Sequence, residues 1–320
     1  MDRPTLIDVL EARRRIAPHV VRTPLLRHLA LDKLLGAQVY VKHENFQRLG
    51  SFKVRGGINL VSRLSDDERR RGVATASSGN HGQSIAYAAR AFGARATVAV
   101  PESANPGKVE SMRNLGADVI FHGDVFEDSR EYVERLASEE GYRYIHAVNE
   151  PQLIAGVGTY TLEIIEDLPE VDVIIVPVGG GSGACGACIV AKAINPAIEI
   201  VGVQAASAPA AYMSWKEGRV VEAPMESMAE GLATRTGYEL PQGILRDLLD
   251  DFVLVSEEEM ERAIVMHLET THTLTEHAGA ASLAAALNMR DRLAGKNVVL
   301  VSSGGNITVD QLKAALETSR

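Results

Sequence analysis

One lysine in this chain stands in a setting that favours chemistry. Residues 50–57 read Gly-Ser-Phe-Lys-Val-Arg-Gly-Gly, so Lys53 lies between two apolar side chains and close to three glycines. We expect its amine to lie near backbone and partly out of water. Because desolvation disfavours the ammonium form, such a lysine can be a neutral nucleophile able to form a Schiff base. The alternative is an ordinary lysine on a helix surface with its amine in solvent. Residues 50–57 alone leave both readings open.

Three polar, glycine-bearing turns follow predicted strands, at residues 77–82, 179–183 and 302–306. In open α/β sheets, ligands bind beyond the carboxyl ends of the strands, so we expect these turns to gather around one site. The middle turn reads Gly-Gly-Gly-Ser-Gly and opens a helix. Its backbone N–H groups and the helix dipole suit a phosphate. Alternatively, the glycines only allow a sharp turn into a closely packed helix.

Two other motifs suggest different ligand sites. Gly181, Gly183 and Gly186 have the G-x-G-x-x-G spacing of a dinucleotide site, which expects an acidic residue at the end of the next strand. That strand ends at Gln204, so NAD is disfavoured. Residues 185–188 form a C-x-x-C, for which a packing role is favoured over redox chemistry.

The histidines give one candidate. His267, His272 and His277 are spaced by five and do not share a helical face, so they do not predict a metal site. His81, inside the first turn, has a ligand role and a helix-capping role as open alternatives.

Short apolar segments alternate with helical segments along most of the chain. The expected strands are 38–43, 73–76, 96–100, 119–121, 144–147, 171–178, 199–204, 252–255 and 298–301. The expected helices are 5–17, 53–64, 80–92, 106–115, 126–139, 153–168, one after 183, two within 257–292 and one at the C-terminal end. This order predicts an α/β protein with two doubly wound, mainly parallel sheets. Residues 206–250 are the least regular part.

Composition excludes several functional classes. The 320 residues suit two domains, and the 46% apolar fraction supports a large core. A net charge of −9 and 5% aromatic residues argue against nucleic acid or an anionic membrane as partner. With two cysteines and no apolar segment at its start, the chain is expected to be cytoplasmic.

Four motifs together resemble one family. Residues 51–57, 77–83, 179–183 and 303–306 occur in the order of the fold-type-II pyridoxal-phosphate enzymes, and most closely resemble the threonine/serine dehydratase and serine racemase group. The resemblance implies a tryptophan synthase β-like fold with the cofactor in the cleft between two domains. It places a large cofactor-binding domain at 1–48 and 150–320, and a small mobile domain at 49–149.

The resemblance also implies residue roles. Lys53 would hold pyridoxal 5'-phosphate, Phe52 would pack against its ring, Asn80 would contact the ring hydroxyl, and Ser303 would bond the pyridine nitrogen. The phosphate cradle would be Gly179, Gly180, Gly181, Ser182 and Gly183, with Glu276 near the cofactor. The substrate carboxylate would be received by Ser77, Ser78, Asn80 and His81.

The implied activity is elimination of the β-hydroxyl from L-threonine or L-serine, giving a 2-oxo acid and ammonia. Alternatives are a serine or aspartate racemase, a 3-hydroxyaspartate dehydratase, and a non-catalytic binding protein. Ser78 favours the racemase because racemases of the group use a serine there as acid and base. Thr234, Arg235 and Arg135 are candidates for binding a second carboxylate.

Two further expectations concern partners. Several relatives bind a divalent ion after the phosphate loop, where this chain has Gln204, Ala208 and Ala210, so no metal is expected. A homodimer is expected from the resemblance, with a small amino-acid substrate as ligand.

Overall fold

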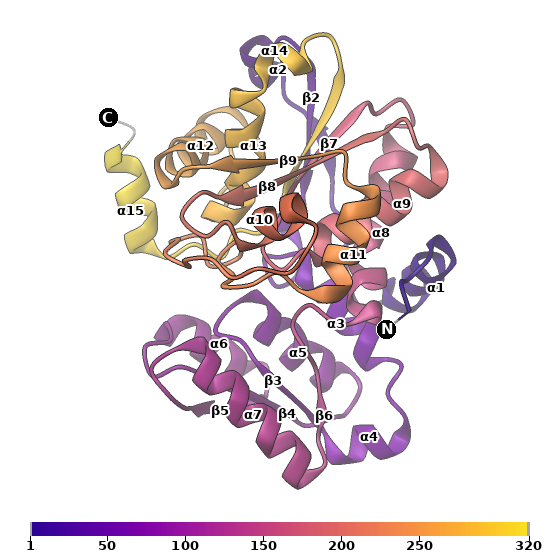
Figure 1. Cartoon of the computed structure of the whole chain (residues 1–320), viewed down its shortest axis with the longest axis vertical. Helices are drawn as coiled ribbons and strands as arrows, with labels where there is room; N and C mark the ends of the chain where they lie inside the picture. The colour runs from indigo at the N-terminus through magenta and orange to yellow at the C-terminus, as the bar shows by residue number, and fades with distance from the viewer. Residues whose placement is uncertain (1, 319–320) are drawn as a thin grey trace.

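The strands form two separate sheets in the computed structural model, which describes residues 2–318 (Figure 1). The larger sheet has six strands in the order β1-β2-β10-β7-β8-β9. Only the pairing of β1 with β2 is antiparallel. Their bounds are β1 Leu25–Arg27, β2 Gln38–His43, β10 Asn297–Ser302, β7 Val173–Pro177, β8 Glu199–Ala205 and β9 Asp251–Val255.

The smaller sheet has four parallel strands in the order β5-β4-β3-β6. These strands are Asp118–Phe121 (β5), Ala96–Val100 (β4), Val73–Ala76 (β3) and Arg143–Tyr144 (β6). All four come from one continuous stretch of chain, which is inserted between β2 and β7 of the larger sheet. The predicted α/β class with two mainly parallel sheets is confirmed.

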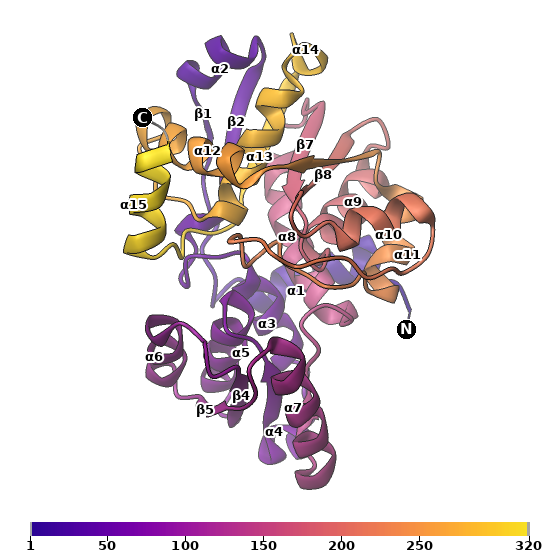
Figure 2. The same ribbon diagram turned by 60° about the vertical axis from the view of Figure 1, so that its left-hand side comes forward.

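Helices cover both faces of the larger sheet and surround the smaller one (Figures 1 and 2). With the larger sheet lie α1 Leu6–Ile16, α2 Leu29–Leu35, α8 Pro151–Asp167, α9 Ser182–Ile194, α10 Ala210–Glu217, α11 Glu239–Leu248, α12 Glu257–Thr270, α13 His277–Asn288, α14 Arg290–Leu293 and α15 Val309–Thr318. The short helix η1 is Glu44–Phe46, and the remaining helices are α3 Lys53–Val61, α4 Asp66–Arg71, α5 Asn80–Ala91, α6 Pro106–Asn114 and α7 Phe126–Glu140. Within residues 2–318 no helix combines the length and apolar character that crossing a bilayer requires.

Local sequence explains the elements that were predicted well. Every residue of β7 is buried, as its unbroken apolar run indicates for a strand covered on both faces. Helix α1 begins after Thr5 because Thr5 and Asp8 form a capping box. Pro106 stands in the first turn of α6, where its missing N–H costs no helical hydrogen bond.

The structure also corrects the sequence-based assignment. The strand expected at 144–147 ends at Tyr144, because the Nδ1 atom of His146 accepts the N–H groups of Val148 and Asn149 and turns the chain. The prediction missed β1, α2, α4, α10 and α11. Helix α11 lies in the segment expected to be least regular, and it buries Leu240, Ile244 and Leu245 against the core around β7.

Candidate active site

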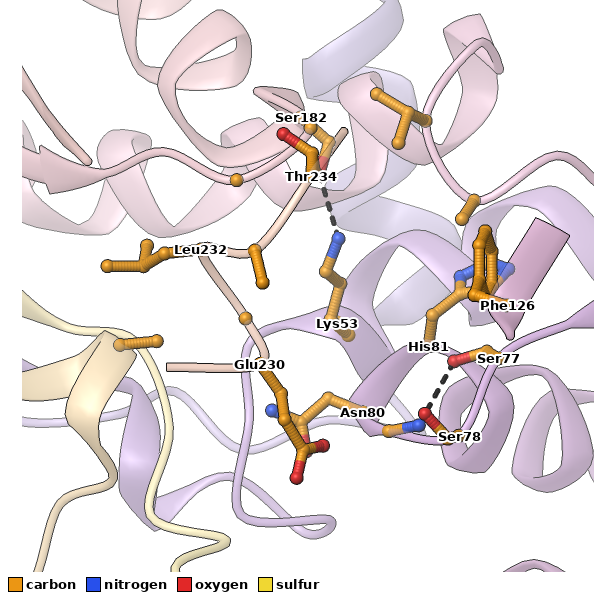
Figure 3. Close-up of a pocket in the computed structure, with 18 of the residues that line it drawn as sticks. Lys53, Ser77, Ser78, Asn80, His81, Phe126, Ser182, Glu230, Leu232 and Thr234 are labelled. Carbon is orange, nitrogen blue, oxygen red and sulfur yellow. Dashed lines mark hydrogen bonds between the residues drawn. The ribbon is translucent and has the colours of Figure 1, made fainter. Parts of the chain in front are cut away.

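A cavity of about 650 Å³ opens between the two sheets. The turns that follow β3, β7 and β10 all contribute to its wall, as the position of ligand sites in α/β proteins predicts. Further parts of the wall come from the start of α7 and from residues 222–238, which lie between α10 and α11. The structure thus brings the three polar turns together around one space. Figure 3 labels side chains from the first two of these turns.

Lys53 is the first residue of α3 and extends into this cavity (Figure 3). Its Nζ atom lies 3.3 Å from Ser182 Oγ and 5.3 Å from the centre of the Phe52 ring. Burial lowers the pKa of the Lys53 amine to about 8. Of the two readings that the sequence left open, the partly desolvated amine is correct.

The chain before Lys53 is fixed by the turn after β10. Phe52 N–H donates to the Ser303 carbonyl at 3.2 Å, and Gly305 N–H donates to the Gly50 carbonyl at 2.9 Å. On the other side, a Cβ added at Gly57 would lie 2.2 Å from Ser84 Oγ, so α3 packs closely on α5. Lys53 therefore starts a helix that is held at both its entrance and its flank.

The glycine turn after β7 presents free backbone donors to the cavity. The N–H groups of Gly179, Gly180 and Gly181 have no acceptor within residues 2–318, and the turn leads directly into the N-terminus of α9. These glycines also meet protein closely, because a Cβ would lie 2.2 Å from the Gly231 carbonyl at position 179 and 2.3 Å from Val148 at position 180. The two interpretations of this turn are compatible. Close packing requires glycine, and the amides remain available to an anion.

The turn after β3 carries Ser77, Ser78, Asn80 and His81 into the wall of the same cavity. The Thr75 hydroxyl donates to the Ile145 carbonyl and therefore accepts from Nε2–H of His81, at 3.0 Å. Burial, with smaller effects of Lys53 and His146, lowers the pKa of His81 to about 3, so the ring is neutral. A capping role for His81 is wrong, because the N-cap of α5 is Gly79.

Glu276 and Ser303 complete the set of predicted residues at the cavity. The Asn80 side-chain amide donates to Glu276 Oε1 at 2.8 Å. Burial raises the pKa of the Glu276 carboxyl, although Lys108 and Asn80 act in the opposite direction. Every residue that the sequence assigned to the cofactor or to the substrate α-carboxylate, from Phe52 to Ser303, lines this one cavity.

Other cavity residues were missed. Lys108 on α6 forms an ion pair of 2.6 Å with Glu230, and both line the cavity. Thr234 and Arg235 are in the wall as expected, but Arg135 is not and stacks on Tyr132 instead. Arg130 is the arginine of α7 that lines the cavity. Arg130 and Arg135 are five residues apart, which places them about 140° apart around the axis of α7. Because the two side chains leave the helix in different directions, helical spacing could have identified the arginine that lines the cavity.

The remaining candidates take structural positions. Gln204 is buried, and its amide donates to the Leu232 carbonyl and accepts from Tyr212 N–H. Within residues 2–318 no group of three or more His, Cys, Asp or Glu side chains is arranged to hold a metal ion. Cys185 and Cys188 are free and buried, and burial raises the pKa of both thiols, which agrees with packing rather than redox chemistry.

Comparisons with known proteins agree with this geometry. The profile of the family described as pyridoxal-phosphate dependent enzyme matches residues 16–304. The L-threonine ammonia-lyase of Thermotoga maritima is 41% identical over 309 residues, covering 96% of this chain and 77% of that protein. The L-threo-3-hydroxyaspartate ammonia-lyase of Saccharomyces cerevisiae is 36% identical, covering 95% of this chain and 94% of the relative. The structure of maize serine racemase superposes with a TM-score of 0.93 and 33% identity, covering 99% of this chain and 98% of that one.

The fold and cavity are those of a fold-type-II pyridoxal-phosphate enzyme. The chain belongs to the pyridoxal-phosphate dependent enzyme family, and its cofactor is pyridoxal 5'-phosphate. The site fits this group, because a lysine amine with a lowered pKa and a turn of unpaired backbone donors face the same cavity.

Proposed function

We propose that this enzyme eliminates the β-hydroxyl of L-threonine or L-serine and releases a 2-oxo acid and ammonia. The observation that carries the proposal is the partly desolvated Lys53 amine beside the glycine turn of α9. The 41% identity to an L-threonine ammonia-lyase supports the choice of substrate.

Residues in the turns and helix starts beside both sheets would hold the cofactor. Lys53 would bind it covalently, and the free N–H groups of 179–181, with Ser182 and Gly183, would bind its phosphate. The Phe52 ring and the Asn80 amide would contact the cofactor ring. The Ser303 hydroxyl would bond the ring nitrogen, and Glu276 would lie nearby.

When bound, the cofactor supplies an electron sink that makes the Cα–H of an attached amino acid acidic. A neutral Lys53 amine is the base that takes this proton, and a pKa of about 8 leaves an appreciable neutral fraction near pH 7. The N-terminus of α5 at Asn80 and His81, with Ser77 and Ser78, binds the substrate carboxylate. The neutral His81 ring cannot add positive charge there.

Elimination ends when the β-hydroxyl leaves and the product separates from the enzyme. Water then converts the released enamine to the 2-oxo acid and ammonia. The test is a panel of L-threonine, L-serine, D-serine and L-threo-3-hydroxyaspartate scored for 2-oxo acid. Lys53→Ala should abolish turnover and the visible absorption of the bound cofactor. If both persist in Lys53→Ala, the catalytic assignment of Lys53 fails. A wild-type protein that binds the cofactor but turns over no substrate of the panel would instead support a non-catalytic binding role.

A racemase is the second candidate, because Ser78 lies in the cavity wall and the fold matches serine racemase closely. Chiral analysis after incubation with L-serine separates the two activities. If Ser78→Ala no longer forms D-serine but still releases 2-oxo acid, the acid and base role belongs to Ser78. Formation of 2-oxo acid alone would leave the lyase as the sole activity.

A dehydratase for 3-hydroxyaspartate needs a site for a second carboxylate. Arg235 lines the cavity, and within residues 2–318 its guanidinium has no hydrogen bond or ion pair. Arg130 also lines it, but it is engaged by Glu134 at 3.1 Å. Loss of activity toward 3-hydroxyaspartate, but not toward threonine, in Arg235→Met would support this substrate.

Three wider expectations also remain proposals. Residues 49–149, which contain the whole four-stranded sheet, would move as a small domain relative to 1–48 and 150–320. The two free, buried thiols support a reducing, cytoplasmic location.

A homodimer would form at the β1–β2 edge, where Leu26, Leu29 and Phe46 are exposed by 44%, 67% and 47%. Sedimentation analysis of the wild type and of Leu29→Asp tests the dimer.

A further inference from the structure

Asn306 is the last residue of the turn after β10, and it connects two parts of the site. Its Nδ2 atom donates to the Leu49 carbonyl at 2.8 Å and to Asn80 Oδ1 at 2.7 Å. Asn306 does not line the 650 Å³ cavity, whereas Asn80 does. The Asn306 side chain therefore reaches this cavity through Asn80.

The direction of these hydrogen bonds follows from one acceptor. A backbone carbonyl can only accept, so the Asn306 group that faces Leu49 must be the NH₂. The same NH₂ reaches Asn80, so the Asn80 atom that faces it must be the carbonyl oxygen. The Asn80 NH₂ then faces the Glu276 carboxylate at 2.8 Å. The Leu49 carbonyl thus fixes the orientation of two side-chain amides in succession.

The backbone around Asn306 leaves it little freedom. A Cβ added at Gly50 would lie 2.7 Å from Asn306 Oδ1, and Gly50 has a φ of +63°. Gly305 N–H donates to the Gly50 carbonyl, and Glu276 N–H donates to the Gly304 carbonyl. Asn306 is therefore held between the segment that leads to Lys53 and the N-terminus of α13.

We propose that Asn306 is a positioning residue that orients the Asn80 amide, so that one Asn80 N–H bonds Glu276 and the second is directed at the cofactor. The proposal rests on the proposed function in one respect, namely that Asn80 contacts the cofactor ring. An Asn80 amide rotated by half a turn would present its oxygen to Glu276, where two acceptors would meet. Asn306 also opposes that rotation, because its NH₂ would then face the Asn80 NH₂.

The test uses the holoenzyme and Asn306→Asp, which keeps the shape of the side chain and removes both donors. We expect the affinity for pyridoxal 5'-phosphate to fall about tenfold, because a hydrogen bond on each side of Asn80 is disturbed. The visible absorption band of the bound cofactor should also change its position and pH dependence. Asn297→Asp is the matched control, since Asn297 Nδ2 donates to the Glu170 carbonyl at the other end of β10. The control should keep the wild-type spectrum and affinity.

Asn80→Ala and the double variant Asn80→Ala/Asn306→Asp complete a thermodynamic cycle. If Asn306 acts through Asn80, Asn306→Asp changes cofactor affinity and spectrum little in the Asn80→Ala background. Additive effects, or an Asn306→Asp enzyme with wild-type affinity and spectrum, would overturn the proposal. A wild-type spectrum and affinity in Asn80→Ala would instead overturn the proposed role of Asn80. If Asn306→Asp fails to fold, Asn306→Ser, which keeps one donor, should show a smaller change in the same direction, and no change would again overturn the proposal.

Discussion

The Arg55 guanidinium donates two hydrogen bonds of 2.8 Å to the Glu44 carboxylate, and neither side chain is accessible to solvent. On its other side Arg55 bonds Glu163, which also accepts from Lys42 at 2.6 Å. Burial by itself would lower the pKa of Arg55, and the two carboxylates more than reverse this. The network joins β2 and η1 to α8 and to α3, two residues beyond Lys53.

Glu44→Gln should destabilise the protein strongly, because it removes one of the two carboxylates that compensate a buried guanidinium. We expect a loss of about 3–5 kcal/mol in the free energy of unfolding, measured by denaturant titration. Glu166→Gln is the control, since Glu166 pairs with Arg13 and Arg22 at the surface and should cost about 1 kcal/mol or less. Equal losses in the two variants would contradict the prediction.

Lys53→Met should stabilise the cofactor-free protein at neutral pH. The folded protein holds Lys53 with a pKa of about 8, below its ordinary value of 10.5, so folding opposes its protonation. The stability lost by burying the protonated amine is largest below pH 8, shrinks as pH rises and vanishes above about pH 10.5. We expect the free energy of unfolding of Lys53→Met to exceed that of the wild type by about 2–3 kcal/mol at pH 7, and this difference to disappear above about pH 10.5. Denaturant titrations across pH check this, with Lys33→Met on the exposed face of α2 as the control. A gain that does not vary with pH would show that the lowered pKa of Lys53 is not its cause.

Gly179→Ala should weaken cofactor binding without a change in any side chain of the site. Its Cβ would lie 2.2 Å from the Gly231 carbonyl, so the turn with the proposed phosphate donors must shift. We expect the affinity for pyridoxal 5'-phosphate, measured by absorbance titration, to fall more than about tenfold, as expected when two hydrogen bonds are lost. Gly243→Ala in α11 has nothing within 4 Å and should leave affinity unchanged. Unchanged affinity in Gly179→Ala would show that this turn does not hold the phosphate.

Glu230→Gln should raise the KM for the amino acid and leave kcat unchanged. The Lys108–Glu230 ion pair connects α6 to the 222–238 segment across the cavity, and the Glu230 side chain is 44% exposed. A pair this exposed contributes about 0–1 kcal/mol, so KM should rise by at most about fivefold. Added salt should raise the wild-type KM toward that of the variant, because salt screens the pair. An equal effect of Glu226→Gln, an exposed neighbour, would argue against the ion pair as the cause.

Most of the fold was predictable because its signals are local. The apolar run of β7, the capping box of α1 and the glycine turn before α9 each act within a few residues of chain. The short helices α2 and α4, of 7 and 6 residues, were missed because so few turns give a weak periodic signal. Helix α10 forms where burial against the core, rather than a clear repeat, decides the structure. Helix α11 carries a helical repeat of Leu240, Ile244, Leu245 and Leu248, which the prediction overlooked.

The site was predictable in part for the same reason. Lys53, the 77–82 turn and the 179–183 turn carry their chemistry in contiguous residues, so residue types and spacing identified them. Arg130, Lys108 and Glu230 enter the cavity only because α6, α7 and the 222–238 segment are packed around it.

By itself, the sequence predicted which residues would carry the chemistry, since residue type and neighbours set the reactivity of an amine and the donors of a turn. Only the tertiary structure decided which groups face each other. Asn306 meets Asn80 from 226 positions away, and Arg55 meets Glu163 from 108 positions away. Such pairings depend on how the sheets and helices pack, and no local pattern in a single chain encodes them. The polarity of the Asn306–Asn80–Glu276 chain likewise follows from one backbone carbonyl, at Leu49, that packing places within 2.8 Å.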